Sequence, residues 1–153
     1  MKSAITWLKR GTLAVLAFLV VAQFFPIKRD DPQADPTHSI YAKEKMPEQV
    51  KNLFEGSCAN CHSDHTAWPW YSHIAPVSWM VASDVHDARK KMNFSEWADY
   101  PANKREERLE EICEQLTNGE MPDPKYLLLH RSARVTPTQR DAVCQWTEDA
   151  RQY

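Results

Sequence analysis

Two cysteines and a histidine lie together in the stretch Cys58-Ala59-Asn60-Cys61-His62. Two thiols at this spacing can each form a thioether with one vinyl group of the same porphyrin, and the imidazole of the next residue can then ligate the iron. The order Cys-x-x-Cys-His therefore predicts one covalently attached c-type haem, with His62 as the proximal iron ligand.

Two other chemistries use the same residue types. A Cys-x-x-Cys pair can be a dithiol redox motif, but that motif belongs in a βαβ unit, and no strand-like alternation surrounds this stretch. The two cysteines, His62 and His65 could also hold zinc. Structural zinc sites usually draw on two separated ligand pairs, and adjacent ligands such as Cys61 and His62 suit a tetrahedron poorly. Zinc and a redox dithiol are the alternatives to haem.

The composition favours helices around a large apolar group. The 153 residues allow one domain plus an anchor, and six Trp with only three Gly argue against a β-rich fold. Residues 1–29 hold five Lys or Arg and no acid, whereas the remainder has 14 Lys and Arg against 21 Asp and Glu, a net charge of −7. An acidic domain argues against nucleic-acid binding and suits redox partner proteins with a basic docking face.

The N-terminal segment is predicted to be an export signal. Residues 1–10 form a short basic segment, and a mostly apolar run follows that extends to Ile27. Cleavage after Ala22 is the alternative to an uncleaved anchor, but it would leave Phe24 and Phe25 exposed at the mature terminus. We therefore favour a transmembrane signal anchor. The early basic residues keep its N-terminus cytoplasmic, so the haem domain is expected in the periplasm, at a bacterial inner membrane.

The chain divides into three parts. Residues 1–28 are the anchor, and residues 46–153 are the haem-binding domain. Residues 29–45 between them contain two prolines and several acids, with no apolar period. We expect this segment to be a linker that holds the domain off the membrane surface.

Four helices are expected in the domain from apolar side chains at helical spacing. They cover residues 47–56, 76–92, 103–118 and the stretch that begins at Thr136. Asn103 is expected to cap the third helix, and Thr136 the fourth, where Gln139 completes a capping box. Arg89 and its two following lysines are expected to form a solvated helix end.

A six-coordinate haem needs a second axial ligand. Met121 lies between the helix stop at Gly119 and Pro122, on a loop that can turn a thioether inward. The order of haem motif, helices, Met-Pro loop and terminal helix is that of small single-haem cytochromes c. A histidine or an open position is the alternative. The other candidate ligands are Met46, Met80, Met92, His38, His65, His73, His86 and His130.

Aromatic residues follow the attachment motif in a stretch that Pro69 and Pro76 keep irregular. The candidates to line the porphyrin are Trp68, Trp70 and Tyr71, and ordinary packing in the protein core is the alternative.

Cys113 and Cys144 are left over and lie on the expected helices either side of the Met121 loop. We predict a disulfide between them, because haem attachment implies an oxidising compartment. Two small buried apolar side chains are the alternative.

These stretches together resemble the bacterial haem-binding domain family. Besides the attachment motif, the resemblance rests on Trp68-Pro69-Trp70-Tyr71-Ser72, Ile74-Ala75-Pro76-Val77-Ser78-Trp79, Asn93-Phe94-Ser95-Glu96-Trp97, Gly119-Glu120-Met121-Pro122 and Tyr126-Leu127-Leu128-Leu129-His130. It covers roughly residues 15–151. The resemblance implies one covalent haem, an N-terminal export segment and an electron-transfer role, and the two remaining cysteines look like family positions. One departure is Asp123, which separates two prolines that the family pattern implies are adjacent.

The predicted fold is all-α: a cytochrome c-like domain of about four helices packed on one covalent haem c, with an N-terminal membrane helix. The expected function is to carry single electrons between membrane-associated redox partners, with no catalytic residue. The alternatives are a haem enzyme or sensor with an open sixth position, which would take peroxide or a diatomic gas, and a subunit of a membrane complex whose haem is structural.

Overall fold

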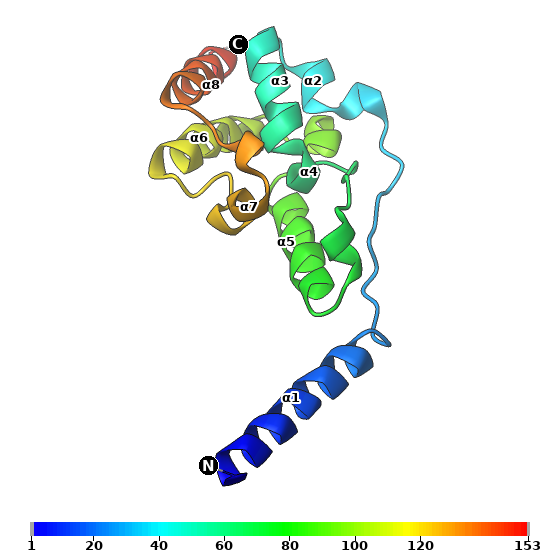
Figure 1. The fold of residues 1–153 in the computed structure, drawn as a ribbon. Coiled ribbons are helices and arrows are strands. Elements are labelled where there is room, and N and C mark those ends of the chain that lie inside the picture. The colour runs from blue at the N-terminus through cyan, green and yellow to red at the C-terminus, as the bar shows by residue number, and fades with distance from the viewer. Residues whose placement is uncertain (1, 153) are drawn as a thin grey trace.

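The chain folds into helices joined by turns and loops. The computed structural model describes residues 2–152, with side chains from residue 4 onward, and this part of the chain contains no strand (Figure 1). The longer helices are α1 (Lys2–Ala22), α3 (Glu48–Ser57), α5 (Val77–Lys91), α6 (Ala102–Asn118) and α8 (Pro137–Ala150). The short ones are η1 (Pro36–His38), α2 (Ile40–Lys43), α4 (Ala59–His62), η2 (Trp70–His73), η3 (Phe94–Asp99), α7 (Pro124–Leu129) and η4 (Arg131–Ala133), where η denotes a 3-10 helix. The predicted all-α fold is confirmed.

The hydrophobic core lies where α3, α6 and α8 meet, with α2 and η3 packed alongside. Its buried side chains are Ile40, Val50, Leu53, Phe54, Phe94, Trp97, Leu109, Ile112, Val143 and Trp146. Phe54 joins three elements, because its ring stacks on Phe94 with 5.1 Å between centroids and meets Trp146 edge-on at 5.4 Å. Since α3 continues directly into Cys58, this core fixes the start of the attachment motif.

Local signals set most helix ends as predicted. Thr136 caps α8 in a capping box with Gln139, and Gly119 ends α6 in the left-handed conformation at φ 71°. The expected cap at Asn103 is wrong: α6 begins at Ala102, and Pro101 is its cap. The carbonyl of Pro101 accepts the first hydrogen bonds of the helix, and the helix does not reach back to Tyr100, because the residue before a proline is disfavoured in the helical region and Tyr100 is extended.

The segment before the domain is partly packed into it. Ile40 in α2 is fully buried in the core, and the Glu44 carboxylate accepts a hydrogen bond from Trp97 Nε1 at 2.7 Å. Pro36 opens η1, whose cap is Asp35. A free linker over residues 29–45 therefore does not describe this structure, since the short run Ile40-Tyr41-Ala42 is too brief to show a helical period and yet anchors the segment in the core.

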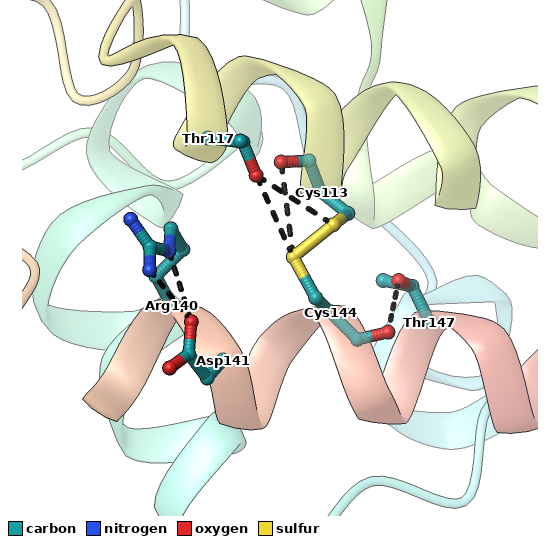
Figure 2. Close-up of a disulfide and its surroundings, with 6 residues drawn as sticks. All are labelled: Cys113, Thr117, Arg140, Asp141, Cys144 and Thr147. Atoms are coloured by element: carbon teal, nitrogen blue, oxygen red, sulfur yellow. Dashed lines mark hydrogen bonds and ion pairs between the residues drawn. A yellow bond between two sulfur atoms is a disulfide. The ribbon is translucent and has the colours of Figure 1, made fainter. Parts of the chain in front are cut away.

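The disulfide between Cys113 and Cys144 is present and joins α6 to α8, as Figure 2 shows. The two Cα atoms are 4.8 Å apart, and the residues are 31 positions apart in the chain. Thr117 Oγ1 lies 3.9 Å from each sulfur. The prediction of this bond is confirmed, and the bond closes the loop that carries Met121.

Helix α1 projects away from the domain, with the labelled helix α5 nearest to its C-terminal end (Figure 1). Its segment Ala4–Ala22 is 19 residues long with mean hydropathy 1.6, and its side chains are exposed up to Ala22, where the helix meets the domain. A helix of this length spans about 30 Å, the thickness of the hydrocarbon core of a bilayer. The helix is compatible with a membrane anchor or a signal sequence.

Candidate haem site

The attachment motif forms one helical turn at the end of α3. Cys58 ends α3 and begins α4, and its carbonyl accepts hydrogen bonds from the amides of Cys61 and His62 at 3.1 and 3.0 Å. Residues three apart on a helical turn share a face, so the two cysteines lie on the same side of α4. Both thiols are free. The turn therefore offers two thiols to one ligand.

The ionisation of these thiols argues against the dithiol alternative. Burial raises the pKa of the Cys58 thiol to about 12 and that of Cys61 to about 11. Catalytic dithiols work as thiolates and have a lowered pKa. The raised pKa favours the protonated thiol in both side chains, unlike the thiolate that a catalytic dithiol requires.

The imidazole of His62 is held with one nitrogen engaged and the other available. Nδ1 lies 2.9 Å from the carbonyl oxygen of Met92, and burial lowers the pKa of the ring. A carbonyl only accepts, so in the neutral ring Nδ1 carries the hydrogen and Nε2 keeps its lone pair. The ring also stacks on Phe94, with 5.6 Å between centroids. This is the arrangement that an axial iron ligand requires.

Zinc finds no support in this geometry. Across residues 2–152, no group of three or more His, Cys, Asp or Glu side chains could hold a metal ion. His38, one of the candidates for the second axial ligand of the haem, is paired with the Asp99 carboxylate at 2.9 Å.

Helix α7 is joined to the attachment turn through Asn60. The side-chain nitrogen of Asn60 donates to Tyr126 Oη at 3.2 Å, and the side-chain oxygen, Oδ1, accepts from the backbone amide of Ala67. The Tyr126 ring stacks on His130 with centroids 4.0 Å apart, and the Tyr71 hydroxyl lies 3.4 Å from the ring nitrogens of His130. The residues between the two cysteines thus hold the segment after Met121 against the motif.

Met121 lies on the loop between α6 and α7, half-exposed, with its amide donating to Gln115. Two residues later, Asp123 caps α7, because its carboxylate accepts from the amide of Lys125 at 2.6 Å. The extra residue between the two prolines is therefore the helix cap. After the larger effect of burial, the carboxylates of Asp84 and Asp123 also raise the pKa of Cys61, which places this loop close to the motif. Met121 as distal ligand stays a prediction.

Large apolar side chains are exposed in two segments of the domain. They include Trp70, Val77, Met80, Met121, Leu128 and Leu129. Tyr71 in the first segment contacts His130, which directly follows the second, so residues 70–80 and 121–129 come together, with Tyr71 close to Cys61. Monomeric domains seldom leave so much clustered apolar surface open. This exposed apolar surface near the attachment turn is the candidate contact surface for a large apolar ligand such as a porphyrin.

The three predicted wall residues have different surroundings. Trp70 is exposed and meets the Tyr71 ring edge-on at 5.8 Å. Trp68 instead donates from Nε1 to the Asp31 carboxylate at 2.7 Å and lines a separate cavity of about 470 Å³ beside α5. Contact of these rings with a porphyrin remains a prediction.

A buried polar network behind the motif was missed in the sequence. Arg89 donates from Nε to the carbonyl of Ser63 at 2.7 Å, and Asn93 donates to the Asp64 carboxylate at 2.8 Å. The expectation that Arg89 is solvated is wrong: its side chain is 14% exposed. Its basic neighbours on α5 gave no signal that distinguishes it, because its partners come from distant parts of the chain.

Comparison with known proteins agrees with this site. A family model described as a haem-binding domain matches residues 17–149, which include the attachment turn and the Met121 loop. No curated protein and no solved structure gives a significant match. The match covers most of the chain, and so the protein belongs to the haem-binding domain family.

Proposed function

We propose that the protein carries single electrons through one haem c, bound covalently at Cys58 and Cys61 and ligated by His62. The observation that carries the proposal is the His62 ring, with Nδ1 held by the Met92 carbonyl and Nε2 left available beside two free thiols. When bound, such a haem supplies an iron that alternates between two oxidation states. The side chains orient this group and exclude water from it, and none acts as a general acid or base.

Met121 is proposed as the sixth ligand. Its loop is held near the attachment turn by the Asn60–Tyr126 hydrogen bond and closed by the Cys113–Cys144 bond. A thioether ligand raises the reduction potential and leaves no open position for peroxide or a diatomic gas. This ligation is what distinguishes an electron carrier from a haem enzyme or sensor.

The proposed location is the periplasmic face of a bacterial inner membrane. Helix α1 is long and apolar enough to serve as the anchor. The disulfide is typical of an exported domain, since such bonds persist in oxidising compartments. Partner proteins would have a basic docking face, because the chain after residue 29 is acidic.

Mass and spectra of the purified full-length protein test the proposal. Intact mass under denaturing conditions should exceed the chain mass by one haem, and the Cys58→Ala/Cys61→Ala variant should lose that increment. The oxidised protein should be low-spin with the weak far-red band of a Met–iron bond. An unchanged mass would exclude covalent haem. A high-spin spectrum with ready binding of carbon monoxide would favour the enzyme or sensor, and low-spin haem that no donor reduces would favour a structural role.

A further inference from the structure

The end of the apolar helix is joined to the domain by a side chain that pairs with the backbone. Gln23 Nε2 donates to the carbonyl of Ala75 at 2.9 Å, and Gln23 Oε1 accepts from the amide of Ala75 at 3.1 Å. The same Nε2 also donates to the carbonyl of Leu19 inside α1. Ala22, the last residue of α1, is buried. The helix therefore ends directly on the turn between η2 and α5.

Two further contacts follow within six residues. Trp79 Nε1 donates to the carbonyl of Phe25 at 2.8 Å, and Arg29 donates to the carbonyl of Ser72 at 3.1 Å. Trp79 and Ser72, the domain residues in these two contacts, lie within a few residues of Ala75, which is bonded to Gln23. The chain after α1 thus stays on one face of the domain.

Arg89 completes the connection. Its guanidinium donates to the carbonyl of Asp30 and, at 3.0 Å, to the Asp31 carboxylate, which also accepts from Trp68 Nε1. The same Arg89 side chain donates to the carbonyl of Ser63, one residue after His62. The residues just beyond the anchor are therefore bonded to the stretch that carries the proximal ligand.

Apolar side chains lie beside these contacts without protein partners to cover them. Phe24 is 78% exposed and Phe25 is 64% exposed, both next to Gln23. Ile74, next to Ala75, is 48% exposed. Aromatic side chains at the end of a spanning helix belong at the level of the lipid headgroups.

We propose that residues 23–31 are a rigid bracket that holds the haem domain in one orientation against the bilayer, with Ile74 at the lipid interface beside Phe24 and Phe25. The inference rests on the proposed function in one respect, because it requires α1 to span the membrane. The partner of this face is a phospholipid surface. The sequence of residues 29–45 suggests a flexible linker that would let the domain rotate freely. The bracket instead keeps the attachment turn at one height above the membrane.

Site-directed spin labels in the full-length holoprotein, reconstituted in phospholipid nanodiscs, test this arrangement. Native cysteines do not interfere, because two are proposed to hold haem and the other two form the disulfide. A nitroxide at Ile74→Cys should be several-fold more accessible to oxygen than to a water-soluble nickel chelate. A nitroxide at Glu148→Cys, an exposed position on α8, should show the opposite preference. Equal, water-like accessibility at both positions overturns the proposal.

Loss of the Gln23 and Trp79 contacts should loosen the bracket at its membrane end. In a Gln23→Ala/Trp79→Phe background, the label at residue 74 should gain mobility and become accessible to nickel, with the haem spectrum unchanged. Gln49→Ala, an exposed glutamine on α3, is the matched control and should leave the label as in the parent protein. A label that keeps its lipid signature after the Gln23 and Trp79 contacts are removed contradicts the assignment of these two residues.

A third label separates this proposal from the membrane anchor. A nitroxide at Leu16→Cys, in the middle of α1, should report the depth of the hydrocarbon core. If residue 16 is in lipid and residue 74 is in water, the bracket is wrong and the anchor stands. If residue 16 is itself in water, the proposed membrane anchoring is wrong, and the bracket is overturned with it.

Discussion

The Nδ1 of His62 lies 2.9 Å from the carbonyl oxygen of Met92, 30 residues further along the chain. This contact decides which nitrogen of the ring faces a bound iron. The carbonyl belongs to the residue that ends α5, where Met92 also donates its amide to Ala88. The orientation of the proposed ligand thus depends on the position of α5 as well as on the attachment turn.

Replacement of His62 by Ala should leave haem attached but misligated. The thioethers form at Cys58 and Cys61 and do not need the imidazole, whereas the iron does. Absorption spectra and a redox titration check this, with a shift to high spin and a changed potential expected. His65→Ala, an exposed histidine three residues on, should keep both properties. Low-spin spectra with an unchanged potential in His62→Ala would remove it as the proximal ligand.

Replacement of Met121 by Ala should open the sixth position. The oxidised protein should lose its weak far-red band, its potential should fall, and the reduced protein should bind carbon monoxide readily. Met80→Ala is a matched control, because Met80 is also exposed but lies on α5. If Met80→Ala removes the band and Met121→Ala does not, the two methionines exchange roles.

Reduction of the Cys113–Cys144 disulfide should destabilise the domain by about 3–4 kcal/mol, since the bond closes a long loop in the unfolded chain. The Met–iron bond should loosen before the thioethers are disturbed, because α6 and α8 flank the Met121 loop. Denaturant unfolding of the Cys113→Ser/Cys144→Ser variant measures the loss. Two alkylatable thiols in the untreated holoprotein would show that the bond does not form in solution.

Replacement of Asp123 by Ala should cost about 1 kcal/mol, the usual value of a lost helix cap. Its carboxylate holds the first turn of α7, from which Tyr126 reaches Asn60, so the Met–iron band should also weaken. Denaturant unfolding and the far-red spectrum measure the two effects. Asp141→Ala removes an exposed carboxylate that is paired only with its neighbour Arg140 (Figure 2), and it should change stability by less than about 0.5 kcal/mol. Equal effects of the two variants would contradict the capping role.

The sequence by itself determined the features whose chemistry is local. The Cys-x-x-Cys-His order, the capping box at Thr136, the stop at Gly119 and the length of the apolar N-terminal run each depend on residues within one or a few turns of a helix. The Cys113–Cys144 bond also followed from sequence, because only two cysteines remained and both lay on helices flanking one loop. Such patterns survive folding because nearby backbone and side chains already supply the interaction.

Tertiary structure alone decided the contacts between residues far apart. The Met92 carbonyl under His62, the burial of Ile40 and the solvent-shielded position of Arg89 have no local signature. Gln23 and Ala75 are 52 residues apart, and neither residue type indicates in the sequence which residue it will contact. A backbone carbonyl or amide is the same in every residue, so its partner is set by which helices pack together. That packing fixes residues 23–31 against the domain, although the sequence suggested a free linker from residue 29 onward.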